Sequence, residues 1–146
     1  MNRYQEILNN SYYNDYEKVM DVNDEIRRKF DEGQLLTREE MVLMCVAELN
    51  DNVNQDGVDC YIMNMYSRKF FPEYFKTTVE ALKKIGAMQT YEKFKEVYEC
   101  YSDMEEYDLD RTEKDRDFTD AFDSWFYQYK ENLVNLEYQY ILNHLI

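Results

Sequence analysis

The amino-acid sequence predicts an all-α protein, a compact bundle of about six helices that forms a single domain over residues 1–146. Hydrophobic residues recur at helical spacing along most of the chain, and no long stretch follows the two-residue period of a strand. The chain holds only 3 Gly and 1 Pro, too few for the tight turns of a sheet. A chain of 146 residues also has the usual length of one domain and can bury a core of its own.

The first two helices are expected on either side of Gly33. An apolar face at helical spacing, formed by Tyr12, Tyr16, Val19, Ile26 and Phe30, predicts a helix over residues 12–31, and Gly33 follows as a helix stop. Residues 1–11 are expected to form a loosely attached N-terminal turn. Thr37 and Glu40 have the spacing of a capping box, in which each side chain bonds the backbone amide of the other residue, so they indicate the start of the second helix.

Three shorter helices are expected in the middle of the chain. The turn at Gly57 separates the second helix from a third over residues 58–67. Pro72 suits the first position of a fourth helix, because a proline lacks the amide that this position leaves unbonded, and Gly86 ends this helix. Thr90 is expected to cap a fifth helix that is rich in aromatic residues.

A long apolar stripe predicts one final helix. Its residues are Phe118, Phe122, Trp125, Phe126, Tyr129, Leu133, Leu136 and Tyr140. Aromatic stripes of this kind are usually core, so they are interpreted as packing residues rather than as a cofactor site. Cys45 lies within an apolar run and is interpreted in the same way, as a small buried hydrophobic residue.

The charge of the chain limits the partners that it can have. It carries 31 acidic and 17 basic residues, a net charge of −14. A field of this sign repels nucleic acid and anionic membranes, so direct nucleic-acid binding is disfavoured and a basic DNA-binding protein is the expected partner. No stretch reaches the roughly 18 apolar residues of a membrane span, and the first ten residues do not resemble a signal peptide. The protein is therefore expected in the cytoplasm, with no membrane association.

No set of residues points to catalysis, a metal or a cofactor. Three cysteines at wide spacings fit neither a disulfide framework nor a zinc site, and His144 is the only histidine that could act as a base. Residues 52–59 resemble the start of a calcium loop, but Met63 stands where the bidentate carboxylate belongs. No glycine-rich phosphate loop is present. The sequence therefore predicts a protein that is not an enzyme and holds no metal or cofactor.

Residues 103–123 concentrate the negative charge and form the candidate partner-binding segment. Against three basic residues stand ten acidic ones: Asp103, Glu105, Glu106, Asp108, Asp110, Glu113, Asp115, Asp117, Asp120 and Asp123. Six of these are spaced by three and four residues, namely Asp103, Glu106, Asp110, Glu113, Asp117 and Asp120. On a continuous helix they would form a ridge with one carboxylate per roughly 5 Å, comparable to the roughly 3.4 Å between phosphates of a DNA strand. The alternative is an acidic loop between two helices that only keeps the protein soluble.

The turn at Gly57 carries a recognisable pattern. Residues 55–64 read Gln-Asp-Gly-Val-Asp-Cys-Tyr-Ile-Met-Asn. This pattern resembles the DNA-mimic-protein family of small acidic helical proteins, which reads Asn-Gly-Gly-Phe-Asp-Gln-Tyr-Phe-x-Asn at the same site. The two agree at Gly57, Asp59, Tyr61 and Asn64, whereas Gln55, Asp56 and Val58 replace Asn, Gly and Phe. The resemblance spans most of the chain from about Tyr16, and it includes residues 81–87 and an acidic final helix with Asp123.

The resemblance implies an all-α fold, often a homodimer, and an activity of imitating duplex DNA to sequester a transcription factor. Within the motif, Gly57 is interpreted as the residue that permits the turn, and Asp59 and Asn64 are expected to bond nearby backbone amides.

Three functions are compatible with these observations. The first is a DNA mimic that occludes the nucleic-acid-binding surface of a transcription factor, a nuclease or a CRISPR-type effector. The second is an immunity-type inhibitor of one cognate toxin, in which shape and buried aromatic anchors outweigh charge. The third is a helical domain whose acidity is merely solubilising.

Overall fold

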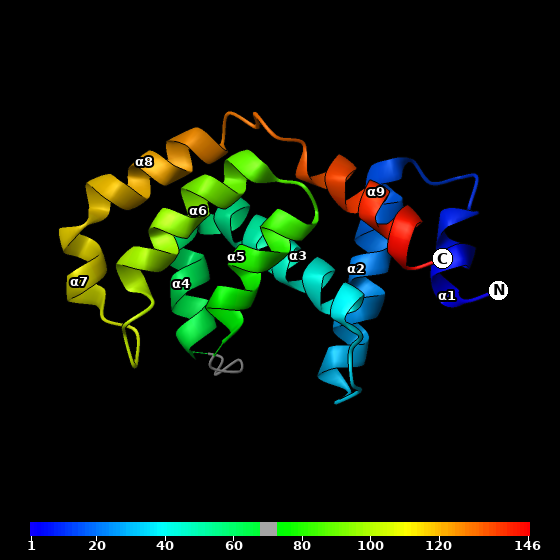
Figure 1. Cartoon of the computed structure of the whole chain (residues 1–146), viewed down its shortest axis with the longest axis horizontal. Helices are drawn as coiled ribbons and strands as arrows, with labels where there is room; N and C mark the ends of the chain where they lie inside the picture. Colours follow the sequence, from blue (N-terminus) through cyan, green and yellow to red (C-terminus); the bar gives the residue numbers. More distant parts are fainter. Residues whose placement is uncertain (68–72) are drawn as a thin grey trace.

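The computed structural model describes residues 1–67 and 73–146, and within them it contains nine helices and no strand (Figure 1). In chain order the helices are α1 (Arg3–Leu8), α2 (Asp15–Asp31), α3 (Arg38–Asp56), α4 (Val58–Ser67), α5 (Tyr74–Lys84), α6 (Met88–Tyr101), α7 (Leu109–Lys114), α8 (Arg116–Phe126) and α9 (Leu133–His144). The all-α prediction is confirmed, although the number of helices is higher than the expected six. Pro72, expected at the start of the fourth helix, lies outside the described residues.

Helix ends follow the local signals in the first half of the chain. The capping box is present at α3, where Thr37 Oγ1 accepts the amide of Glu40 at 3.1 Å and Glu40 Oε1 accepts the amide of Thr37 at 2.9 Å. Gly57 ends α3 with a φ of +89°, a conformation that favours glycine. α2 begins three residues later than expected, because Asn14 caps it, and Tyr12 is consequently 93% exposed rather than part of an apolar face.

α3 is the centre of the molecule. It packs against α2 and α9 on one side and against α4 and α5 on the other, and α6 packs on α5 (Figure 1). Its residues 42–47 are all buried, Cys45 among them. A cluster of aromatic rings fills the space between α4, α5 and α6, where Tyr61 lies edge-on to Phe75 and Phe94 with centroid distances of 5.8 and 5.4 Å.

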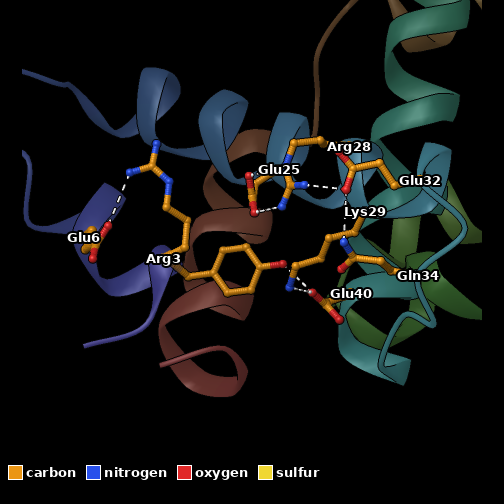
Figure 2. A network of polar contacts seen from close by, with 9 residues as sticks. Arg3, Glu6, Glu25, Arg28, Lys29, Glu32, Gln34 and Glu40 are labelled. Atoms are coloured by element: carbon orange, nitrogen blue, oxygen red, sulfur yellow. Dashed lines mark hydrogen bonds and ion pairs between the residues drawn. The ribbon is translucent and has the colours of Figure 1, made fainter.

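The N-terminal segment is firmly packed, which corrects the expectation of a loose turn. Tyr4 and its helix neighbours Ile7 and Leu8 are buried, and the Tyr4 hydroxyl donates a hydrogen bond to the carboxylate of Glu40. The same carboxylate accepts a hydrogen bond from Lys29 Nζ at 2.8 Å (Figure 2). Burial would raise the pKa of Glu40, but Lys29, the backbone amide of Thr37 and the Tyr4 hydroxyl hold it below the ordinary value.

The final apolar stripe is split into two helices, so the expectation of one long helix is wrong. α8 ends at Phe126, and residues 127–132 connect it to α9 across the top of the view in Figure 1. Glu131 in this connection accepts the backbone amides of Gln89 and Thr90 at 3.1 and 2.5 Å. Thr90 therefore lies inside the first turn of α6 and receives a cap from another segment instead of capping the helix itself.

None of the helices described here has the length and apolar character that crossing a membrane requires.

Candidate partner-binding surface

The acidic segment of residues 103–123 is not one continuous helix. Residues 102–108 form an irregular connection after α6, and α7 and α8 follow with a break at Asp115. Asp108 starts α7, because its Oδ1 accepts the backbone N–H of Arg111 at 3.3 Å. A single ridge of six carboxylates required a continuous helix, and the structure does not meet that condition. Two pairs of acids still lie three residues apart within one helix: Asp110 and Glu113 on α7, and Asp117 and Asp120 on α8.

Most of the carboxylates in this segment are nevertheless on the surface. Eight are exposed: Asp103, Glu105, Glu106, Asp108, Asp110, Glu113, Asp117 and Asp120. They come from the connection before α7, from α7 and from α8, at the end of the molecule opposite to the two termini (Figure 1). We call these eight side chains the acidic surface. The other two acids of the segment, Asp115 and Asp123, are half-buried.

Arg111 holds the irregular part of the segment against the body of the protein. Its Nη1 lies 2.8 Å from Asp103 Oδ1, and its Nη2 donates to the backbone carbonyl of Cys100 at 2.5 Å. The guanidinium also lies over the ring of Tyr101, 5.8 Å from its centroid. Arg111 thus neutralises part of the charge of Asp103, and it fixes the connection relative to the end of α6. The two other bases of the segment, Lys114 and Arg116, are exposed.

Asp123 has a structural role that the sequence did not indicate. Its Oδ1 accepts the backbone N–H of Val58 at 2.8 Å, so it caps the start of α4 from a position 65 residues away. Burial raises the pKa of Asp123 to about 6, and the negative charges of Asp59 and Asp120 add to the rise, while the Val58 amide opposes it. Asp123 was expected among the partner-binding residues, but these contacts assign it to the joint between α8 and the α3–α4 turn.

The family-motif residues that follow Gly57 lie on α4, and two of them bond side chains of the neighbouring helices α3 and α5. Tyr61 is buried and its hydroxyl donates to Thr78 Oγ1 at 2.8 Å. Asn64 donates to the side chain of Asn52 at 2.5 Å, and not to a backbone amide as expected. Asp59 also departs from expectation, because its buried Oδ1 accepts no hydrogen bond from the residues that the structure describes. Burial raises the pKa of Asp59, and Arg116 opposes the rise.

Acidic residues of α6 extend the surface beyond the segment. Glu92, Glu96 and Glu99 are exposed, are spaced by four and three residues, and belong to a helix that packs against α8. Their spacing was visible in the sequence, but the two bases between them, Lys93 and Lys95, reduce the local excess of negative charge. The packing of α6 beside α8 places these carboxylates in the same half of the molecule as the acidic surface (Figure 1).

The fold and this surface define a class: small all-helical proteins that display many carboxylates at one end. The family model described as DMP19-like protein matches residues 34–144, and the chain belongs to this family. The matched range contains all of α3 to α9 and leaves out α1 and α2. This finding confirms the resemblance that residues 55–64 indicated. No curated protein and no solved structure gives a significant match to the chain.

Proposed function

We propose that the protein is an acidic binding protein that mimics DNA and occupies the nucleic-acid-binding surface of a basic protein, such as a transcription factor, a nuclease or a CRISPR-type effector. The observation that carries this proposal is the acidic surface, eight exposed carboxylates at one end of the molecule. Membership of the DMP19-like family supports DNA mimicry in general terms.

The spacing of the carboxylates suits this activity. Within α7 and within α8 the paired acids are three residues apart, which is roughly 4.5 Å along a helix axis, of the same order as the roughly 3.4 Å between phosphates of one DNA strand. A DNA-binding protein neutralises phosphates with Lys and Arg, and the same side chains can pair with carboxylates. Long-range attraction between the −14 chain and such a partner also gives fast, salt-sensitive association.

A variant in which four acids of the acidic surface are replaced by amides, compared with a matched control, tests the proposal. The test variant combines four substitutions on the acidic surface: Asp110→Asn, Glu113→Gln, Asp117→Asn and Asp120→Asn. The control makes the same change in charge at four exposed acids of α2 and α5, namely Asp15→Asn, Asp31→Asn, Glu17→Gln and Glu80→Gln. The partner is captured from the native host at low ionic strength, and its binding is measured in competition with a labelled DNA duplex.

We expect the test variant to bind the partner at least about tenfold more weakly and to lose its competition with DNA, because each lost ion pair removes part of the salt-dependent attraction. The control variant is expected to keep most of both. An equal loss in the two variants would show that only the overall charge matters. Binding that blocks the partner's activity without displacing DNA would indicate an immunity-type inhibitor instead.

A further inference from the structure

A groove with aromatic walls lies at the opposite end of α8 from the acidic surface. It has a volume of about 810 Å³ and is bounded by the start of α2, the second half of α3 and the connection between α8 and α9. Its aromatic residues are Tyr16, Trp125 and Tyr129, together with the buried Phe126. Tyr16 and Tyr129 are 58% and 63% exposed, although both were expected to be core residues. These two rings are therefore available to a partner.

The wall that carries Tyr129 is held in place from several sides. Tyr129 adopts a φ of +50°, a left-handed conformation that is uncommon for residues other than glycine and that is often found at functional sites. Its hydroxyl donates to Asn54 Oδ1 at 2.8 Å, and the hydroxyl of Tyr127 donates to the carbonyl of Val53 at 2.5 Å. Glu131 anchors the other end of the connection at the start of α6. The groove is thus ordered before any partner arrives, which lowers the entropic cost of binding.

The polar groups of the groove favour a cation. Asp51 lines it and remains partly exposed, with Oδ2 accepting Arg27 Nη2 at 2.6 Å and Oδ1 bonded to no other group in the described part of the chain. The lining of the groove includes one base, Lys130, and two acids, Asp51 and Glu131. Arg27, which pairs with Asp51, also pairs with Glu48, so the balance of charge around the groove remains negative. The net charge of −14 disfavours anionic ligands such as phosphates and nucleotides. Aromatic faces beside a carboxylate suit a guanidinium, which stacks on rings and forms directed hydrogen bonds with oxygen atoms.

We propose that this groove binds an arginine side chain of a basic protein, with the guanidinium stacked against the rings of Tyr16, Trp125 and Tyr129 and hydrogen-bonded to Asp51. The inference rests on the proposed function only for the source of the arginine. Lysine is a weaker occupant, because its ammonium group is more strongly hydrated and has no flat face to stack on a ring.

Trp125 is the only tryptophan of the chain, so its fluorescence reports on the groove. The full-length protein is titrated with acetyl-tetra-arginine amide and with acetyl-tetra-lysine amide, two probes of equal charge. We expect the arginine peptide to change Trp125 fluorescence saturably and to bind about fivefold or more tightly than the lysine peptide. Equal affinity of the two peptides, or a signal that does not saturate, would overturn the proposal and indicate attraction by net charge alone.

Two tyrosines four residues apart provide a matched pair of variants. Tyr16→Ala removes a wall of the groove, whereas Tyr12→Ala removes a ring that is 93% exposed and does not line it. We expect Tyr16→Ala to abolish most of the preference for arginine and Tyr12→Ala to leave it unchanged. An identical response of the two variants contradicts the proposal.

The variant in which four carboxylates of the acidic surface are neutralised separates this inference from the proposed function. It should bind both peptides more weakly and still prefer arginine by the same factor, since the groove residues are intact. Loss of the arginine preference in this variant would overturn the groove as an independent site. Conversely, a protein that competes with DNA but shows no arginine preference would refute the groove and leave the proposed function standing.

Discussion

Gly57 and Asp123 depend on each other for the position of α8 beside the α3–α4 turn. Gly57 has a φ of +89° and a ψ of 175°, a backbone region that is essentially restricted to glycine. A Cβ at this position would lie 2.5 Å from Asp123 Oδ2, far inside contact distance. The small residue therefore allows the carboxylate to reach the amide of Val58. Gly33 has a similar φ of +77°, but a Cβ there would meet nothing within 4 Å.

The substitutions Gly57→Ala and Gly33→Ala compare a glycine in contact with Asp123 with a glycine in open space. We expect Gly33→Ala to lower the free energy of unfolding by about 1 kcal/mol, the usual cost of a left-handed alanine. Gly57→Ala is expected to cost about 2–4 kcal/mol, because its backbone region is more strained for alanine and because the substitution displaces Asp123 from its hydrogen bond to Val58. Denaturant unfolding of both variants measures the difference, and equal losses would show that Asp123 moves aside without cost.

At the residue scale, the sequence predicts what depends on neighbours in the chain. The cap at Thr37 and the glycine turn at Gly57 follow from two or three adjacent residues, and both are present. The role of Asp123 could not be predicted, because its partner Val58 is 65 residues away. In the sequence Asp123 is one acid among ten in its segment, and only the packing of α8 on α4 distinguishes it from the exposed ones.

The contact between α2 and α9 contains a buried carboxyl group that no base neutralises directly. Glu137 is 1% exposed, and its Oε1 accepts a long hydrogen bond of 3.5 Å from Asn23 Nδ2. Glu137 Oε2 and Asn23 Oδ1 have no hydrogen-bond partner within the described ranges. Burial raises the pKa of Glu137 to about 8, with Asp51 adding to the rise, and with the Asn23 amide and Arg27 opposing it.

A neutral Glu137 makes the stability of the α2–α9 contact depend on pH. The folded protein keeps this proton up to a pH of about 8, whereas the unfolded chain releases it near its ordinary pKa of 4.5. The contribution of the group is therefore most favourable below pH 4.5 and is lost as the pH rises toward 8, at up to about 1.4 kcal/mol per pH unit.

We expect Glu137→Gln to remove this loss and to be more stable than the natural chain at pH 7 by a few kcal/mol, because glutamine keeps a hydrogen-bonding group and has no proton to release. Unfolding free energies measured from pH 5 to pH 8 check the result. Glu80→Gln, at an exposed position of α5, serves as the control for the loss of one acidic side chain. If the difference between natural chain and Glu137→Gln stays constant over this range, Glu137 is ionised in the fold.

At the element scale, helices with one clear apolar face and a local cap were predictable, and breaks set by distant contacts were not. The stripe from Phe118 to Tyr140 has helical spacing throughout, yet the chain leaves the helix after Phe126. Tyr129 turns to reach Asn54 on α3, and Glu131 caps α6. These contacts join segments that are more than 40 residues apart. For the same reason the 3-4 spacing of acids did not guarantee a continuous helix.

At the scale of the whole molecule, positive and negative charges are distributed unevenly. The half that contains the termini pairs its bases internally, as Arg28 does with Glu25 and Glu32 at 2.6 and 2.7 Å and Lys29 does with Glu40 (Figure 2). The acidic surface at the other end has eight exposed carboxylates and one ion pair in the described residues, between Arg111 and Asp103. Like charges held close together repel one another and oppose folding.

This repulsion predicts a salt dependence of stability that can be assigned to the acidic surface. Raising NaCl from about 20 mM to about 500 mM shortens the screening length from roughly 20 Å to roughly 4 Å. We expect the melting temperature of the natural chain to rise by about 2–4 °C. The variant neutralised at Asp110, Glu113, Asp117 and Asp120 should gain clearly less, and the variant neutralised on α2 and α5 should gain nearly as much as the natural chain. Thermal unfolding of the three proteins at both salt concentrations decides this. A gain that is the same in all three would mean that the carboxylates of α7 and α8 are too far apart to repel one another, and hence too dispersed to present the dense line of charge that a basic DNA-binding surface accepts.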